Sequence, residues 1–102
     1  MNFKTLEQKV VKNALDYGKR HNINFDQEFA TIKLMEEVGE FAQDLLIHQK
    51  KCRESKFVSQ DISKQEIGYE LADVIGMAMV NAHLLGIDLE KAIDKKWIHK
   101  NK

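Results

Sequence analysis

The sequence predicts an all-α fold, a bundle of four helices. Three observations favour this class. The 102 residues include no proline and only five glycines, so few positions are expected to interrupt a helix. Long segments carry apolar residues at spacings of three and four, which is the period of an amphipathic helix. No segment shows the alternation of apolar and polar residues that is typical of a half-buried strand.

The first two helices are expected on either side of a polar connection over residues 22 to 26. The first covers residues 4 to 20, because Gly18 and a polar stretch lie near its end. The side chains expected to face inward are Leu6, Val10, Val11, Ala14, Leu15 and Tyr17. The second helix starts near Asp26 or Gln27 and runs to about Lys51.

The last two helices follow a polar loop that contains Ser55 and Ser59. The third is expected from about Ser63 to Leu85, and Gly86 suits its left-handed C-terminal cap. Asp88 can cap a fourth helix. The apolar residues of that fourth helix are Leu89, Ala92, Ile93 and Trp97.

Length and composition narrow the classes of partner. A chain of 102 residues makes one domain, residues 1–102. Lys plus Arg equals Asp plus Glu at 16 each, so no net charge favours nucleic acid as a partner. No apolar run approaches the roughly 20 residues of a membrane span, so no membrane partner is expected. Cys52 is the only cysteine, which is typical of a reducing compartment, and a cytoplasmic location is expected.

The only cluster of basic residues in the sequence lies at the C-terminus. Such a cluster is typical of a solvated helix end, where cations interact favourably with the helix dipole, and a phosphate contact is the secondary interpretation. Its members are Lys95, Lys96, His99, Lys100 and Lys102.

Two acidic motifs lie inside apolar helical patterns about thirty residues apart: EEVGE, from Glu36 to Glu40, and ELAD, from Glu70 to Asp73. At 100° per residue, Glu36 points nearly opposite the apolar stripe of the second helix. Glu37, Glu40 and Asp44 instead share one flank of that stripe. On the third helix, the polar and borderline positions beside the apolar face are Glu66, Glu70, Asp73, Met77 and Asn81.

A metal site explains this pairing of motifs. One acidic motif alone is typical of a solvated helix face. Two such motifs on consecutive antiparallel helices bring four carboxylates to one level, where they repel each other unless a cation lies between them. Oxygen ligands favour Mg²⁺, with Mn²⁺ as a substitute. A di-iron centre is less favoured, because no histidine follows Glu40 or Glu70 at the third position.

Three segments together carry a resemblance to a known family. They are KLMEEVGEFA from Lys33, ELADVI from Glu70 and LGIDLEKAI from Leu85. Over about residues 27 to 97 the chain resembles the MazG-type nucleotide pyrophosphohydrolases of the all-alpha NTP pyrophosphatase superfamily. The resemblance implies Mg²⁺-dependent cleavage of a nucleoside triphosphate between the α and β phosphates, which gives a monophosphate and pyrophosphate. It also implies a helical oligomer and a role in cleaning the nucleotide pool.

The resemblance assigns roles to residues at the matching positions. The metal ligands are Glu37, Glu40, Glu70 and Asp73, and the catalytic residues are Glu36, Glu37 and Glu40. Glu36 either orients or deprotonates a water or is a solvent-facing glutamate. The candidates for phosphate contacts are Lys33, Lys96 and Lys100. The side chains considered for a base pocket are Phe25, Phe29, Ile47, Met77, Asn81 and Trp97, and of these Asn81 and Trp97 are the predicted substrate-binding residues.

Oligomerisation is also expected on physical grounds. The third helix is apolar over most of its circumference, and short neighbouring helices cannot cover it fully. We therefore expect a homodimer or homotetramer. Members of the family that the chain resembles commonly extend past the fourth helix, whereas this chain stops at Asn101 and Lys102, so the resemblance implies that part of the phosphate site is either missing or supplied by another subunit. Two alternatives to the triphosphatase stay open: a non-catalytic metal- and nucleotide-binding module, and a phosphoribosyl-ATP pyrophosphohydrolase.

Overall fold

The computed structural model describes residues 1–99, and within this range the chain is helical and contains no strand. The predicted all-α class is therefore confirmed. Lys100 and Lys102, two of the predicted basic residues, lie outside the described range. The α-helices are α1 (Phe3–Arg20), α2 (Gln27–His48), α3 (Gln60–Leu85) and α4 (Leu89–Ile93); a 3-10 turn, Glu54–Lys56, precedes α3, and a π-helical turn, Asp94–Ile98, follows α4.

Side chains cap the starts of the helices. Asp26 accepts a hydrogen bond from the amide of Phe29, and Asp88 accepts one from the amide of Lys91, as predicted for Asp88. Gly86 ends α3 with φ of 68°, which confirms it as the C-terminal cap. The start of α3 was placed three residues too late, because Ser59 is the residue that caps it by accepting from the amide of Ile62. The end of α2 was placed three residues too late, since Lys50 already has a positive φ.

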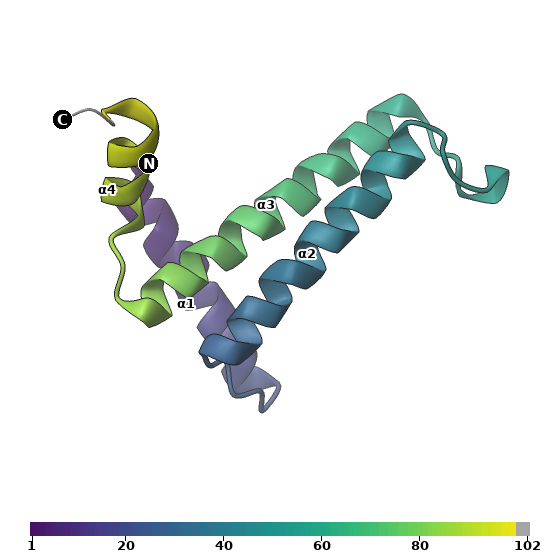
Figure 1. The fold of residues 1–102 in the computed structure, drawn as a ribbon. Coiled ribbons are helices and arrows are strands. Elements are labelled where there is room, and N and C mark those ends of the chain that lie inside the picture. Colours follow the sequence, from purple (N-terminus) through teal and green to yellow (C-terminus); the bar gives the residue numbers. More distant parts are fainter. Residues whose placement is uncertain (100–102) are drawn as a thin grey trace.

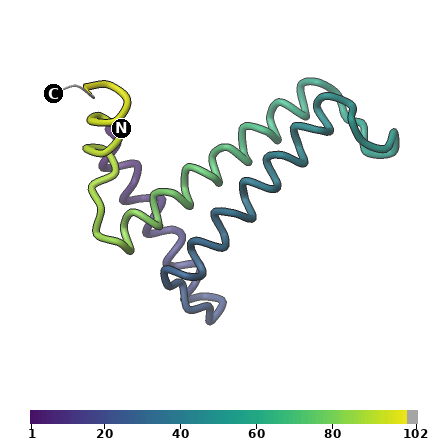
Figure 2. The backbone as a smooth tube through the Cα atoms, in the orientation of Figure 1, coloured from purple at the N-terminus to yellow at the C-terminus, as the bar shows by residue number. Residues whose placement is uncertain are grey.

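Helices α2 and α3 form a long antiparallel hairpin, and α1 packs across one end of it (Figure 1). The short α4 lies beside the start of α1, as the backbone path in Figure 2 also shows. An ion pair joins these two segments, with Lys4 Nζ 2.6 Å from Asp88 Oδ1. The other end of the hairpin, toward the 3-10 turn, extends away from α1.

The core lies where α1 crosses the hairpin. Its buried residues are Val11, Ala30, Met79 and Val80, which come from all three long helices. Val10 packs against α3 at Gly76, where an added Cβ would lie 3.4 Å from Val10 Cγ1. The predicted inward side chains Leu6 and Tyr17 are instead exposed, because α1 is covered on one side only.

One flank of the hairpin is apolar and exposed. Val38 on α2 is 47% exposed, and Leu71 and Ile75 on α3 are 45% and 55% exposed. The helical period places these residues on one side of the hairpin, together with Met35. We call these four residues the apolar flank. They are exposed because no third helix covers the hairpin along this side.

The chain has more surface than a compact protein of its mass. Its accessible surface is 7694 Å² for 11.8 kDa, whereas about 5,900 Å² is typical of a folded monomer of that size. Its radius of gyration is 16.1 Å, against about 13 Å for a compact domain. No single described helix is long and apolar enough to cross a membrane; only α3 taken with Leu89–Ile98, across a 113° bend, reaches that length and composition.

Candidate active site

The pairing of α2 with α3 brings the two acidic motifs together. Asn81 of α3 fixes the register, since its amide donates to the carbonyl oxygens of Ala30 at 3.0 Å and Met77 at 2.7 Å. Its side-chain oxygen accepts from Gln27 and Thr31 of α2. At this register, carboxylates one helical turn apart on each helix face the same flank.

The carboxylates form two groups that share one member. Glu36, Glu37 and Glu40 make the first group, and Glu37, Glu70 and Asp73 make the second. In each group one ligand oxygen from every residue lies within 4.8 Å of the others. We call the two groups together the carboxylate cluster. All four predicted metal ligands belong to it, and so does Glu36, which the helical wheel had set apart.

The negative charge of the carboxylate cluster is not balanced by nearby cations or hydrogen-bond donors of the described residues. One oxygen of Glu37 and one of Glu70 are buried without a hydrogen-bond partner among the described residues. Burial, together with the neighbouring carboxylates of Glu40 and Asp73, raises the pKa of Glu37 to about 7. Burial and the nearby Glu40 and Asp44 likewise raise the pKa of Glu70. Oxygen ligands and unpaired negative charge fit a divalent cation, so the cluster can hold one.

Lys33 is the cation nearest to the first group. It forms an ion pair with Glu36 one turn along α2. This hydrogen bond, together with the charges of Glu36, Glu37 and Glu40, raises the pKa of Lys33, which therefore stays protonated. One lysine cannot neutralise five carboxylates, and its charge is directed to the exposed Glu36 rather than to the buried oxygens of Glu37 and Glu70.

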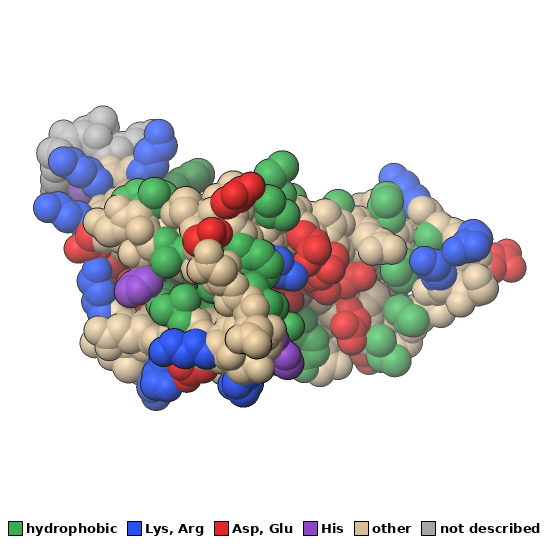
Figure 3. All heavy atoms as spheres, turned by 90° about the horizontal axis from the view of Figure 1, so that it is seen from below, with side chains coloured by type: hydrophobic (Ala, Val, Ile, Leu, Met, Phe, Trp, Pro, Cys, Tyr) green, Lys and Arg blue, Asp and Glu red, His purple; other side chains and the backbone are tan. Residues whose placement is uncertain are grey.

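A cleft of about 620 Å³ adjoins the carboxylate cluster between α1, α2 and α3. Glu36, Lys33 and Asp73 line it where it meets the cluster, and Phe25 and Phe29 line it toward the start of α2. Phe29 and Glu36 are seven residues apart, which is about 10 Å along a helix. In Figure 3 the acidic side chains form a patch along the hairpin, and hydrophobic side chains adjoin it on the side toward α1.

The aromatic part of the cleft is held in place by a close contact. Gly18 lets the end of α1 approach the connection to α2, because an added Cβ would lie 3.1 Å from the carbonyl oxygen of Ile23 and 3.3 Å from Phe25 Cβ. The rings of Phe25 and Phe29 then meet edge to face, with centroids 4.8 Å apart. This end of the cleft is therefore apolar and well packed.

The structure does not gather all the predicted substrate-binding residues at the cleft. Lys33 lines it, but Lys96 and the exposed Trp97 line a separate hollow on the C-terminal turn. Asn81 is engaged in the hydrogen bonds that join α2 to α3. Of the other residues considered for a base pocket, Phe25, Phe29 and Met77 line the cleft and Ile47 does not.

Sequence reasoning missed one wall of the cleft altogether. Asn13, Tyr17 and Arg20 of α1 line it opposite the hairpin. Counted from Val10, successive members are three, four and three residues apart, which places them on one helical face. The helical period alone does not show which element that face contacts. Asp44, whose charge contributes to the raised pKa of Glu70, was noticed as part of the acidic flank and was not assigned a role.

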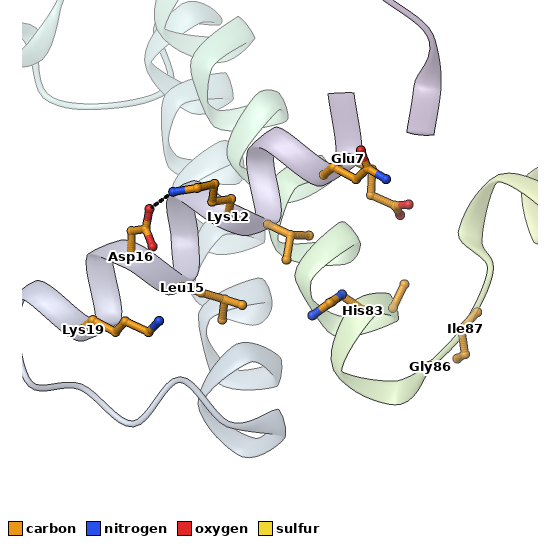
Figure 4. Close-up of a pocket in the computed structure, with 11 residues that line it drawn as sticks. Glu7, Lys12, Leu15, Asp16, Lys19, His83, Gly86 and Ile87 are labelled. Atoms are coloured by element: carbon orange, nitrogen blue, oxygen red, sulfur yellow. Dashed lines mark hydrogen bonds and ion pairs between the residues drawn. The ribbon is translucent and has the colours of Figure 1, made fainter. Parts of the chain in front are cut away.

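A second groove, of about 650 Å³, lies on the other side of α1 (Figure 4). Leu15 of α1 and His83 of α3 face each other across it. Asp16 on its rim is paired with Lys12 at 2.6 Å. Neither of its acidic residues, Glu7 and Asp16, belongs to the carboxylate cluster, so this groove lacks the metal-binding chemistry of the cleft.

One of the comparisons with known proteins identifies a family for this chain. The family model for phosphoribosyl-ATP pyrophosphohydrolase matches residues 19–99, which is most of the chain and includes the whole carboxylate cluster. The chain belongs to this family. No curated protein and no solved structure shows a significant match to it.

Membership of the phosphoribosyl-ATP pyrophosphohydrolase family has two consequences. The protein is a pyrophosphohydrolase, a hydrolase that acts on phosphoric anhydrides, as predicted. The family is also MazG-like and all-α, so the resemblance seen in the three sequence segments is confirmed. The match to the phosphoribosyl-ATP pyrophosphohydrolase family begins at residue 19 and thus leaves out nearly all of α1.

Proposed function

We propose that the protein is a divalent-cation-dependent nucleoside triphosphate pyrophosphohydrolase. It cleaves the anhydride bond between the α and β phosphates and releases a nucleoside monophosphate and pyrophosphate. The observation that carries the proposal is the carboxylate cluster, in which two groups share Glu37 and two buried oxygens have no partner among the described residues. A surface acidic patch would keep its oxygens in water, whereas these are arranged for a cation.

In this proposal the cation ligands are Glu37, Glu40, Glu70 and Asp73. Mg²⁺ suits this set because hard cations take oxygen ligands, and Mn²⁺ is expected to substitute for it. When bound, a divalent cation neutralises phosphate oxygens and lowers the pKa of a coordinated water. Glu37 belongs to both groups, so it is the residue whose loss affects every ligand position at once.

Glu36 and Lys33 act at the border between the cluster and the cleft. Glu36 is exposed and can accept a proton from the attacking water, while its ion pair with Lys33 holds it in place. Lys33 also lines the cleft, where its ammonium group can contact a phosphate of the substrate. In the balanced reaction, the oxygen of one water forms a bond to the phosphorus of one of the two bridged phosphates, the bond from that phosphorus to the bridging oxygen breaks, and the proton released by the water leaves through Glu36.

A second candidate substrate is phosphoribosyl-ATP, which the description of the matching family favours. Both candidates contain the same bond between the α and β phosphates, so the carboxylate cluster serves either one. The two reactions differ in cellular role: removal of unwanted nucleotides from the cytoplasmic pool, or a step in a biosynthetic sequence. The size and shape of the cleft determine which substrate is used, because the cleft has to accommodate an extra phosphoribosyl group only when phosphoribosyl-ATP is the substrate.

We further propose that the protein works as a homodimer formed through the apolar flank. The chain exposes about 1,800 Å² more than a compact monomer of its mass. A standard interface buries about 800 Å² on each partner, and obligate dimers bury more. A second copy of the chain supplies an equal apolar flank. A dimer of such dimers would be a tetramer.

The test of function is a product assay with purified protein. Canonical and modified nucleoside triphosphates, and phosphoribosyl-ATP, are incubated with Mg²⁺, with Mn²⁺ or with EDTA. Monophosphate and pyrophosphate are resolved from diphosphate and phosphate. The variant Glu40→Gln removes one proposed ligand, and Glu28→Gln is a matched control because Glu28 is an exposed glutamate on the same helix and outside the cluster.

Three outcomes separate the candidates. Pyrophosphate release that disappears with EDTA and with Glu40→Gln, but not with Glu28→Gln, supports the proposal, and the best substrate decides between the two enzymes. Cation-dependent nucleotide binding without turnover would indicate a binding module instead. Release of phosphate rather than pyrophosphate would overturn the assignment of the cleaved bond.

A further inference from the structure

One wall of the cleft belongs to α1, and it carries side chains of a different kind from the hairpin walls. Val10, Asn13, Ala14, Tyr17 and Arg20 line the cleft from this helix. Their spacing of three and four residues places them on one helical face. This face has no carboxylate, whereas the wall formed by the α2–α3 hairpin carries Glu36 and Asp73.

Contacts at both ends of the wall fix the position of Asn13. On one side, Val10 packs against Gly76 of α3, which is one turn from Asp73. On the other side, Gly18 packs against Phe25 at the aromatic end. Asn13 lies between these two contacts along α1, so its amide is placed between the carboxylate end and the aromatic end of the cleft.

The amide of Asn13 is available for a ligand. The amide of Asn81 makes four hydrogen bonds within the hairpin, but Asn13 makes none to another described residue. Tyr17, one turn further on, has its ring oriented by a contact with His21, with centroids 4.4 Å apart. The wall thus offers a side chain with one donating and one accepting group beside an aromatic ring.

The family match covers the hairpin walls of the cleft and, of the α1 wall, only Arg20. Residues 19–99 match the phosphoribosyl-ATP pyrophosphohydrolase family, and they include the carboxylate cluster and both phenylalanines. Asn13 and Tyr17 precede the match. The carboxylate end of the cleft therefore lies within the family match, and Asn13 and Tyr17 of the α1 wall lie outside it.

We infer that the α1 wall recognises the nucleobase of the substrate and sets the substrate preference. The Asn13 amide hydrogen bonds to an edge of the base that presents an adjacent donor and acceptor, and Tyr17 packs against the face of the base. The inference rests on the proposed function, since it requires the triphosphate to lie at the carboxylate cluster. The base then extends about two helical turns along the cleft, toward Phe25 and Phe29.

The experiment measures preference rather than activity alone. Values of kcat/KM are determined for a panel of nucleoside triphosphates with wild-type protein, Asn13→Ala, Asn13→Asp and Tyr17→Ala. Gln8→Ala is the matched control, because Gln8 is an exposed amide on the same helix that lines the other groove. Binding of the monophosphate products is measured in EDTA, so that the base contact is observed without the cation.

The expected result is a change in ranking. Loss of a bidentate amide contact reduces discrimination between bases by about 5- to 100-fold. Asn13→Ala is expected to reduce the preference of the wild type by this factor and to weaken monophosphate binding. Asn13→Asp, which replaces the donor with an acceptor, is expected to change which base is preferred. Gln8→Ala is expected to leave both the ranking and the binding as in the wild type.

The outcomes distinguish this inference from the proposed function. If the wild type releases pyrophosphate and all three wall variants keep its ranking of substrates, the inference is wrong and the function stands. If no substrate is cleaved but the monophosphates bind in a manner that depends on Asn13, base recognition stands and the proposed reaction is wrong. If nothing is cleaved and no monophosphate binds, both are wrong.

Discussion

The two flanks of the α2–α3 hairpin differ in the side chains that they carry and in the kind of partner that each would bind. On one flank, carboxylates converge and two of their oxygens lack partners among the described residues. On the other flank, Met35, Val38, Leu71 and Ile75 are exposed to water. The acidic flank needs positive charge, and the apolar flank needs removal from water. In the function that we propose, the same two helices carry a site for a divalent cation and a surface for a second copy of the chain.

The difference shows why neither flank is explained by stability of the single chain. Converging carboxylates repel each other and weaken the fold unless a cation is bound. Burial of apolar surface stabilises a fold by about 25 cal/mol for each Å², and exposed apolar side chains lack this contribution. Each flank is thus unfavourable in isolation, and the proposed cation and second chain would each remove that cost.

The largest effect is expected on the acidic flank, from Glu37→Gln. This substitution keeps the shape of the side chain but removes the carboxylate common to both groups. Mutation of a residue that only orients a metal ligand typically reduces metal affinity or activity by about 10- to 100-fold. Glu37 is proposed as a ligand itself, so its loss is expected to reduce kcat/KM for pyrophosphate release by at least about 100-fold. The melting temperature in EDTA is expected to stay the same or rise, because repulsion is removed. Activity above half that of the wild type would contradict the site.

A charge on the apolar flank is the second test. Ile75→Glu places a carboxylate where the proposed dimer buries an apolar side chain, which costs about 3 kcal/mol or more and raises the dimer dissociation constant by at least about 100-fold. Sedimentation velocity measures this shift, and circular dichroism checks that the helices remain. Tyr69→Glu is the control, since Tyr69 is similarly exposed at 57% on the same helix but faces away from the flank. A dimer that survives Ile75→Glu would exclude this surface as the interface.

Much of the acidic flank was predictable from the sequence, because it depends on local spacing. Glu37 and Glu40 are three residues apart, as are Glu70 and Asp73, and helical periodicity alone places each pair on one face. The caps at Asp26, Gly86 and Asp88 were predictable for the same reason, since capping involves residues close in sequence.

The cleft was not predictable, because it depends on the angle at which α1 crosses the hairpin. That angle is set by contacts between residues far apart in the chain, such as Val10 with Gly76. The apolar residues of α1 were assigned to a single core-facing stripe, whereas the structure divides its surface between the core and two grooves. The placement of Trp97 depends equally on tertiary contacts, and these leave it exposed on the C-terminal turn.

A smaller effect is expected when pH is used to change the charge of the acidic flank. The pKa of Glu37 is raised to about 7 in the folded chain from an ordinary value near 4.5. Between these values the folded state holds a proton that the unfolded state has lost, so the free energy of unfolding decreases as pH rises toward 7. The melting temperature in EDTA is therefore expected to be higher at pH 5.5 than at pH 8.

Comparison with Glu37→Gln isolates this carboxyl from the other titrating groups. The variant is expected to show a smaller decrease between pH 5.5 and pH 8 than the wild type. Mg²⁺ is expected to raise the melting temperature of the wild type more at pH 8, where the ligands are ionised, than at pH 5.5. Equal decreases in the two proteins would show that Glu37 titrates normally.

The smallest effect is expected between the flanks, at Asn81, whose side chain joins α2 to α3. Asn81→Ala removes hydrogen bonds with a net contribution of about 1 kcal/mol, which lowers the melting temperature of a domain of this size by about 4–8 °C. The sequence predicted a contact with substrate at this position, and KM separates the two roles. Because the amide is engaged within the hairpin, we expect the melting temperature to fall while KM for the nucleotide stays within about twofold, a change too small for the loss of one hydrogen bond to substrate.

The outcome at Asn13→Ala is expected to be the reverse, since that exposed amide bonds to no other described residue and faces the cleft. A marked rise in KM for Asn81→Ala without loss of stability would instead mean that the amide leaves the hairpin to bind substrate, and that the register of the two flanks is fixed by apolar packing alone.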